Sequence, residues 1–500
     1  MNVEKALEVY QFTNRRMKAL HLAFFLEGWD RETLAPRISA EARAAEIGTL
    51  SEMSYELTTS PEYLEAIEVL YAHREELSAV LAHEVTELKK HGDRLARIPQ
   101  DKYVAYSELS ARAFPVYVDA KRGNNWAAFA PMLEQILAFQ KEYSQIADPN
   151  LVGYDLLLDE YEPEYGQKEY DEFFDLIKRE LVPLVAKIRA KGERAPAAWT
   201  KQRFPIDKQK HFAEYLRTVM CFNPACTVMA ESEHPFTSNF GRKDVRITNH
   251  FHEDDFLSAI FSAIHEMGHG MYERQVSAEL DNTMSGGGAS MAMHESQSRF
   301  FENMIGRSLA FWQTHMGALK EIFPEQLADV SAEDMYREIN RVECSLIRTE
   351  ADEVTYPLHV LIRYELEKEL LSGRLAVEDL PAAWNAKYKE YLGVDVPNDS
   401  KGVLQDVHWA HGSFGYFPTY ALGSAYAAQM YAAMGKDLDI ETAMRQPTLK
   451  AIGGWLAAKV HTYGASRYPK QILREATGED FDPHYFLDYL KKKYTALYDL

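Results

Sequence analysis

Cysteine is scarce in this chain, which has only Cys221, Cys226 and Cys344 among its 500 residues. An odd and widely spaced set of cysteines does not form the disulfide framework of a small secreted protein and is typical of a reducing compartment. The chain also lacks any uninterrupted apolar run of about 18 residues, and its N-terminus has no signal-peptide core. We therefore expect a cytoplasmic protein with no membrane partner.

The chain also has fewer basic than acidic residues. The chain has 55 lysines and arginines against 76 aspartates and glutamates, which gives a formal net charge of −21. Such a surface repels phosphate backbones, so a nucleic-acid partner is not expected. A surplus of acidic residues also keeps proteins soluble, and one arginine reverses the field inside a cleft, so the charge does not exclude a peptide substrate.

No linker, low-complexity tract or internal repeat divides the chain, so we expect a single domain over 1–500. Apolar residues recur at spacings of three and four among good helix formers, which predicts a mainly α-helical fold. The clearest such segments are 62–90, 168–192, 255–276 and 358–372.

One segment, 234–252, departs from the helical pattern. It holds a glycine turn followed by alternating polar and apolar residues at 244–248, which predicts a short β-hairpin. Because the hairpin comes directly before the main chemical motif, it is either a wall of the active-site cleft or a simple cap on a helical domain.

That motif is H-E-M-G-H at 265–269. On a helix, residues four apart lie on one face, so His265 and His269 reach a single metal ion. Glu266 then lies beside the open coordination position, where it accepts a proton from metal-activated water. Gly268 and Gly270 are poor helix formers, and their presence predicts close packing against a neighbouring element.

A catalytic zinc site takes three protein ligands and leaves one position for water. Glu295 follows His269 by 26 residues, on a helix expected at 289–305 after the glycines at 286–288. Two antiparallel helices joined by this turn bring Glu295 against both histidines. His294 is a rival ligand, but it points about 100° away on the same helix. A second alternative is that Glu295 only pairs with Arg299 at i,i+4.

Further motifs follow in a fixed order: H-P-F at 234–236, D-x-R-x-T at 244–248, H-E-S-Q at 294–297, I-R-x-x-A-D at 347–352 and G-x-x-Q-D-x-H-W at 402–409. Together with H-E-M-G-H, they stand in the order found in the M32 metallocarboxypeptidase family, the thermostable carboxypeptidase type, which this sequence resembles. The N-terminal half fits that family in length and helical character, without a motif of its own.

The resemblance implies a carboxypeptidase of broad specificity, which releases single amino acids in sequence from peptides with a free C-terminus. It implies one divalent ion per chain, zinc or alternatively cobalt, held by His265, His269 and Glu295, with Glu266 as general base. It also implies a homodimer. The expected fold is almost wholly helical, with a deep central groove and the β-hairpin beside the metal. Residues up to about 230 then form one wall, and 231–500 carry the metal site.

Recognition of a free carboxylate calls for an arginine, which grips a carboxylate through two parallel hydrogen bonds. Arg246 and Arg348 are the two candidates. For each, the alternative is a structural ion pair with the acidic residue of its own motif, Asp244 or Asp352.

Hydrolysis also needs donors for the oxyanion that develops on the scissile carbonyl. We assign this role to His408 and Tyr420. Gln405 and Asp406 are expected to orient a ligand histidine from behind. The other motif residues expected at the substrate are His234, Asp244 and Thr248.

Three other functions remain open at this stage. The groove could serve a dipeptidyl carboxypeptidase or an endopeptidase, the chain could bind peptides without cleaving them, or the zinc could be structural. Glu266 argues against a binding protein, which needs no base. The lack of an obvious fourth ligand after Glu295 argues against a structural zinc site.

Overall fold

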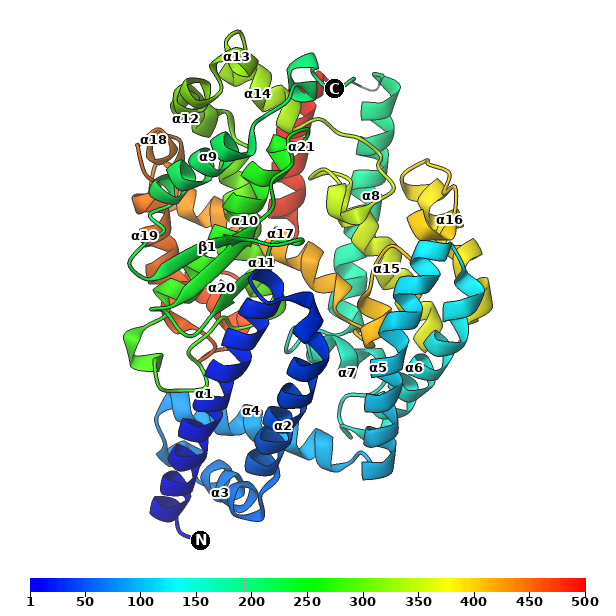
Figure 1. The fold of residues 1–500 in the computed structure, drawn as a ribbon, viewed down its shortest axis with the longest axis vertical. Coiled ribbons are helices and arrows are strands. Elements are labelled where there is room, and N and C mark those ends of the chain that lie inside the picture. The colour runs from blue at the N-terminus through cyan, green and yellow to red at the C-terminus, as the bar shows by residue number, and fades with distance from the viewer. Residues whose placement is uncertain (193) are drawn as a thin grey trace.

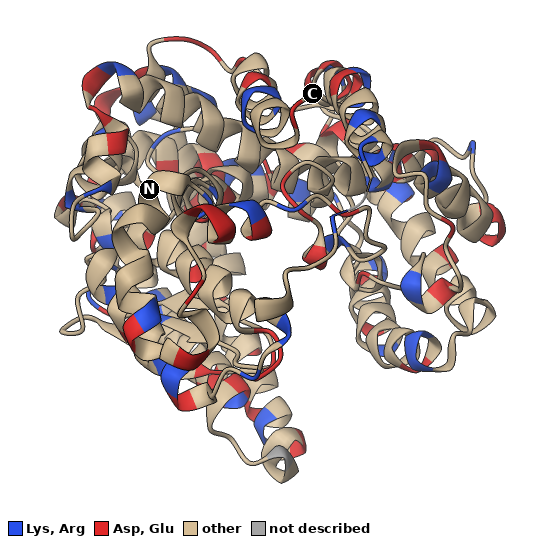
Figure 2. Ribbon diagram, turned by 90° about the horizontal axis from the view of Figure 1, so that it is seen from above, with Lys and Arg blue, Asp and Glu red and all other residues tan. Residues whose placement is uncertain are grey.

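The computed structural model describes residues 1–192 and 194–500 and is mainly α-helical, as the sequence predicted (Figure 1). Figures 1 and 2 show two lobes, with charged residues of both signs spread over their outer helices. One lobe holds α5 (Gln100–Gly123), α6 (Trp126–Ile146), α7 (Tyr154–Asp159), α8 (Gln167–Ala190), α15 (Tyr356–Leu371) and α16 (Leu380–Tyr391). The other holds α9 (Ile206–Val219), α10 (Phe256–Gln275), α11 (Met291–Arg299), α12 (Leu309–Ile322), α13 (Pro324–Leu327), α14 (Ala332–Ile339), α17 (Phe417–Asp437), α18 (Ile440–Met444), α19 (Lys450–Lys459), α20 (Pro469–Thr477) and α21 (His484–Tyr498).

A smaller N-terminal unit consists of α1 (Val3–Thr33), α2 (Ala40–Thr59), α3 (Pro61–Ala72) and α4 (Ala79–Ala96). Helices α1, α3 and α4 share a small apolar core of their own, whereas α2 has no buried side chain. The single helix predicted over 62–90 is wrong, because the chain turns between α3 and α4. Ser78 caps the new helix by accepting a hydrogen bond from Leu81 N–H at 3.3 Å.

The other helix predictions are confirmed by α8, α10 and α15. The helix expected at 289–305 is α11, which continues into a π-helical stretch over Phe300–Gly306. Among the described residues, no helix has an apolar stretch long enough to cross a membrane.

Three short strands form one sheet in the order β1–β3–β2: β1 (Thr227–Glu231), β2 (Thr237–Asn239) and β3 (Val245–Asn249). The antiparallel pair β2–β3 is the predicted hairpin. Strand β1, which runs parallel to β3, was not predicted. Helix α10 packs on one face of the sheet, where a Cβ on Gly270 would lie 3.3 Å from Val245 Cγ1. Helix α1 packs on the other face, with Trp29 against Phe236.

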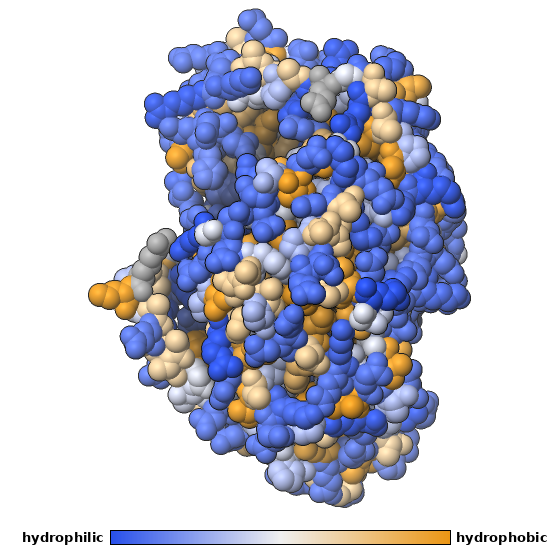
Figure 3. Space-filling model, turned by 90° about the vertical axis from the view of Figure 1, so that its right-hand side faces the viewer, coloured by the Kyte–Doolittle hydropathy of each residue, from blue (hydrophilic) through white to orange (hydrophobic). Residues whose placement is uncertain are grey.

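One main hydrophobic core extends through both lobes. Its buried residues are drawn from the sequence between Leu109 and Tyr498. Helices α15 and α16 come from the C-terminal half of the chain and pack with α6 and α8 from the N-terminal half. Figure 3 shows a mostly hydrophilic face that is hollowed in its upper half, with apolar residues visible inside the hollow.

Helix α11 is held tightly between α10 and α17 at two glycines. A Cβ added to Gly268 would lie 2.7 Å from Ser298 Cα, and one added to Gly423 would lie 2.9 Å from both Ala292 O and Glu295 Cβ. The predicted close packing at Gly268 is therefore confirmed, and it fixes the distance between the helices that carry the expected ligands.

Gly423→Ala should therefore push α17 away from α11. We expect a loss of about 1–3 kcal/mol in the free energy of unfolding, because the new methyl group overpacks a rigid contact. Gly48→Ala in α2 is the matched control, since nothing lies within 4 Å of a Cβ there. Thermal or urea unfolding should show the control to be as stable as the parent or slightly more stable. Equal stability of all three proteins would contradict the tight contact.

Candidate metal centre

The two histidines of the H-E-M-G-H motif project from one face of α10. Asp255 caps this helix by accepting a hydrogen bond from Ser258 N–H at 3.3 Å. The imidazole rings of His265 and His269 lie 4.9 Å apart, as residues four apart on a helix should.

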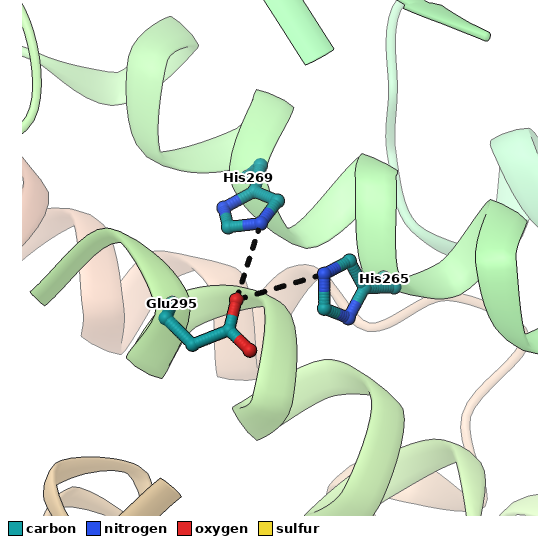
Figure 4. A group of neighbouring side chains, drawn as sticks. All are labelled: His265, His269 and Glu295. Carbon is teal, nitrogen blue, oxygen red and sulfur yellow. Dashed lines mark ion pairs between the residues drawn. The ribbon is translucent and has the colours of Figure 1, made fainter. Parts of the chain in front are cut away.

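Glu295, which lies on α11, points toward the same two histidines. Its Oε2 lies 3.7 Å from Nε2 of His265 and 3.5 Å from Nε2 of His269 (Figure 4). The donor atoms of the three side chains all lie within 4.8 Å of one another. The structure thus brings together the three residues that were predicted as ligands.

This donor set fits a divalent cation. In a tetrahedral zinc site, nitrogen and oxygen ligands at about 2.0–2.2 Å lie about 3.4 Å from each other, close to the distances between Glu295 and the histidines. Burial lowers the pKa of His269 to about 3, which leaves the neutral imidazole that binds metal. Burial also acts to lower the pKa of His265, but Glu295 and Glu302 outweigh it and raise that pKa. The same negative field attracts a metal cation.

Glu295 also pairs with Arg299, so the ion pair posed as an alternative does form, without excluding the predicted role of Glu295 as a ligand. Arg299 Nε donates to Oε1 of Glu295 at 2.7 Å, which leaves Oε2 for the histidines. Burial acts to raise the pKa of Glu295, yet Arg299 and His265 hold it well below its ordinary value. The carboxylate is therefore charged and fixed in orientation.

Each ligand histidine is supported from behind. Nδ1 of His265 lies 2.9 Å from Oε2 of Glu302. Nδ1 of His269 lies 2.6 Å from Nδ1 of His294, whose Nε2 lies 2.7 Å from Oε1 of Glu273. His294, the rival ligand, therefore faces the side of His269 that points away from Glu295. Such partners fix the tautomer and ring orientation of a ligand histidine.

Glu302 and Glu273 were not among the predicted site residues. A signal for Glu302 was present, because Glu295, Arg299 and Glu302 follow one another at helical spacings of four and three. Glu273 carried a similar signal, because it follows His265 and His269 at spacings of four on one helix, although its partner His294 lies 21 residues away.

Glu266 turns toward strand β2. The hydroxyl of Thr237 lies 2.6 Å from Oε2 of Glu266 and 3.0 Å from its carbonyl oxygen. Burial raises the pKa of Glu266, although His265 and the Thr237 hydroxyl act against this. A residue of the predicted hairpin thus holds the Glu266 carboxylate beside the three candidate metal ligands.

Arg348 lies in a buried network around Asp406. Its Nε and Nη2 donate to Oδ1 of Asp406 at 3.0 and 2.8 Å, and Arg363 Nε donates to Oδ2 at 2.7 Å. Burial acts to raise the pKa of Asp406, but the two arginines hold it far below its ordinary value. The expected partner Asp352 is wrong, and so is the placement of Gln405 and Asp406 behind a ligand histidine.

His408 and Tyr420 lie together, with His408 Nε2 3.1 Å from the Tyr420 hydroxyl. Burial lowers the pKa of His408 to about 3 and raises the pKa of Tyr420 well above its ordinary value, so both groups are neutral. The Arg348 guanidinium stacks 4.8 Å from the centre of the Tyr420 ring. The ring of Tyr356 lies 6.5 Å from that of Tyr420 and carries the Arg299 guanidinium at 4.3 Å.

Through Tyr356, the Arg348 cluster adjoins the three candidate metal ligands. Arg348 Nη1 lies 3.4 Å from the Tyr356 hydroxyl, and Arg299 binds Glu295 directly. The predicted donors and one of the two predicted arginines are therefore near the expected ligands.

The other predicted substrate residues lie in and around the sheet. Arg246 forms a two-bond ion pair with Asp244, at 2.8 and 2.7 Å, and its guanidinium stacks 4.7 Å from the Phe25 ring of α1. Thr248 is fully buried, and its hydroxyl accepts a hydrogen bond from Phe236 N–H at 3.0 Å. Thr248 thereby fixes the loop before β2. His234 is exposed in that loop.

Comparison with known proteins identifies the family. A family model described as Carboxypeptidase Taq (M32) metallopeptidase matches residues 10–494. The chain belongs to the M32 family. It is 40% identical over 485 residues to Carboxypeptidase 1 of Bacillus subtilis, covering 97% of each chain. It is 38% identical over 487 residues to Thermostable carboxypeptidase 1 of Thermus thermophilus, covering 95% of each.

Solved structures agree with this assignment. The M32 carboxypeptidase from Deinococcus radiodurans R1 matches with a TM-score of 0.91 at 33% identity, covering 100% of this chain and 99% of that one. Metallocarboxypeptidase 1 of Trypanosoma cruzi matches with a TM-score of 0.94 at 30% identity, covering 99% and 100%. This M32 peptidase is therefore a peptide hydrolase of a family that depends on a divalent metal.

Glu302→Gln keeps the shape of the side chain behind His265 but removes its charge. We expect metal affinity to fall by about 10- to 100-fold, because the imidazole loses a charged partner that orients it. Competition with a chromogenic chelator measures this dissociation constant. Glu325→Gln, at an exposed position, is the control and should leave metal affinity unchanged. Equal affinities in the two variants would show that Glu302 does not support the site.

Proposed function

We propose that this protein is a cytoplasmic metallocarboxypeptidase that releases amino acids one at a time from free peptide C-termini, with broad side-chain specificity. The observation that carries the proposal is the three-residue donor set of His265, His269 and Glu295, beside which Glu266 is held by Thr237. Within the described residues this donor group has three members, which suits a catalytic site with a position left for water.

Zinc is the metal that best suits two imidazoles and a carboxylate, and cobalt is the alternative. When bound, such an ion polarises the scissile carbonyl and lowers the pKa of water. Glu266 accepts a proton from the attacking water and then delivers it to the leaving amine. Its raised pKa suits the first half of this transfer, because a more basic carboxylate takes the proton from water more readily.

We assign recognition of the terminal carboxylate to Arg348. It adjoins the metal ligands through Tyr356, whereas Arg246 faces α1. Neighbouring residues of a strand point to opposite faces, so Arg246, paired with Ser238, lies on the face opposite to Thr237 and Glu266. Asp406 occupies Nε and Nη2 of Arg348, and Nη1 points toward the Tyr356 hydroxyl.

Tyr420 is the proposed donor to the oxyanion, and His408 supports it. Nδ1 of His408 is buried with no hydrogen-bond partner among the described residues, which favours the tautomer that carries the proton on Nε2. His408 Nε2–H then donates to the phenol oxygen and leaves the phenol proton for the substrate. Tyr416, whose ring lies 5.1 Å from that of Tyr420, closes the other side of the cluster. Asp244 and His234 remain proposed contacts at the outer part of the site.

Peptides with a free C-terminus are the proposed partners, and nucleic acids and membranes are not. The relationship to the M32 family also supports a homodimer, which light scattering coupled to gel filtration would test.

Replacing Glu266 by Gln should reduce kcat by at least about 10²-fold, because the base that moves the proton is lost. Metal content, measured on the same protein, should remain at one ion per chain. Timed release of amino acids from one peptide and from its C-terminal amide is the readout. Single residues released only from the free acid support the proposal. Internal fragments from both peptides would reassign the enzyme as an endopeptidase.

A second comparison concerns the two arginines. Arg348→Lys should lower kcat/KM for free-acid peptides by about 10- to 100-fold, mostly through KM, because an ammonium group cannot keep the two bonds to Asp406 and also present a fixed donor to the substrate carboxylate. Arg246→Lys is the matched variant and should have a much smaller effect. A larger loss of kcat/KM in Arg246→Lys than in Arg348→Lys would assign carboxylate recognition to Arg246 of the hairpin.

A further inference from the structure

Glu367 on α15 is a fully buried carboxylate that the proposed reaction does not use. Its Oε1 accepts a hydrogen bond from the indole N–H of Trp409 at 2.8 Å. Its Oε2 accepts one from the main-chain N–H of Gly415 at 2.9 Å and one from the Tyr154 hydroxyl at 2.6 Å. Burial raises the pKa of Glu367 to about 7, although these three donors act against it. The three hydrogen bonds offset the cost of burying the carboxylate.

Two of these bonds reach the chain on either side of the proposed oxyanion donors. Trp409 directly follows His408 in the sequence. Gly415 comes two residues before α17 begins at Phe417, and Tyr420 lies in the first turn of that helix. One carboxylate therefore joins the two stretches of chain whose side chains meet, with His408 Nε2 3.1 Å from the Tyr420 hydroxyl.

Helix α15 also holds the chain before His408. Arg363, one turn before Glu367 on this helix, donates from Nε to Oδ2 of Asp406 at 2.7 Å. Among the described residues, the imidazole of His408 has one hydrogen-bond partner, Tyr420, because its Nδ1 is buried without one. The orientation of His408 therefore depends on main chain that α15 fixes on both sides.

Gly415 shows how closely this main chain is confined. Its φ is +93°, and a Cβ there would lie 2.5 Å from Leu157 O of α7. The chain that leads into α17 thus passes between α7 and the Glu367 carboxylate.

We propose that Glu367 is a positioning residue for peptide hydrolysis, which holds His408 and Tyr420 where the phenol can donate to the oxyanion. The inference rests on the proposed carboxypeptidase activity. Glu367 acts through Trp409 and Gly415, without touching the substrate. An oxyanion donor is most effective when it is fixed before the charge develops. A displacement of about 1 Å at such a group costs up to about 10²-fold in rate.

Glu367→Gln keeps the shape of the side chain but cannot keep both bonds to this chain. An amide has one oxygen, whereas Trp409 Nε1–H and Gly415 N–H are both donors, so its NH2 group faces an N–H in either orientation. We expect kcat for release of the C-terminal residue to fall about 10- to 100-fold, with KM changed less than about 3-fold. The inhibition constant of a phosphonate analogue of the same peptide should rise by a similar factor, because it mimics the tetrahedral intermediate. An unchanged inhibition constant, or a loss of kcat matched by lost metal, would overturn the proposal.

Two further variants separate positioning from stability. Trp409→Phe and Tyr154→Phe each remove one hydrogen bond to Glu367, but only Trp409 lies beside His408 in the chain. Urea unfolding should show both variants to be destabilised. Trp409→Phe should lower kcat about 3- to 10-fold, whereas Tyr154→Phe should change it less than about 2-fold. Equal kcat values in the two variants would overturn the proposal, and this comparison decides it even if Glu367→Gln does not fold.

A crystal structure of Glu367→Gln gives a readout that does not depend on activity. The separation of His408 Nε2 and the Tyr420 hydroxyl should exceed about 3.5 Å, beyond hydrogen-bond reach. An unchanged separation would overturn the proposal. If the parent enzyme releases no amino acid from the peptide, the proposed activity itself has failed, and this separation alone then decides the role of Glu367.

Discussion

The site depends on one buried carboxylate whose two oxygens have different partners. Arg299 binds Oε1 of Glu295, and Oε2 faces the two ligand histidines. A buried carboxylate without a cation would be protonated or expelled, and one fully neutralised by arginine would have little left for a metal. The division between its two oxygens resolves this conflict. It requires that α11 approach α10 and α17 at the distance of a glycine contact, which Gly268 and Gly423 allow.

Much of this centre could be predicted from sequence because its signals are local. His265 and His269 lie four apart on one helix, and Glu295 follows a glycine-rich turn on the next. The sequence could not decide between Glu295 as ligand and Glu295 as partner of Arg299, since both require only a helix. In the structure Oε1 accepts a hydrogen bond from Arg299 and Oε2 faces His269, so the ion pair does not exclude the predicted ligand role.

The predictions that failed concern contacts between distant segments or weak local signals. Asp406 was placed behind a histidine, but it binds Arg348 and Arg363, which lie 58 and 43 residues away. Strand β1 has no alternating pattern and exists because it pairs with β3. The break between α3 and α4 lies among helix-favouring residues, and only the cap at Ser78 marks it. In each case three-dimensional packing overrides the local preference.

The short length of β2 has a consequence for the protein in solution. Exposed sheet edges are where folded proteins recruit one another into fibres, and long flat edges are the most hazardous. Strand β2 is three residues long and lies between α1 and α10, so two of its residues, Thr237 and Asn239, turn their main chain outward. The flanking helices keep a second sheet from stacking on it. An edge of this size gives identical molecules no surface along which a fibre could grow.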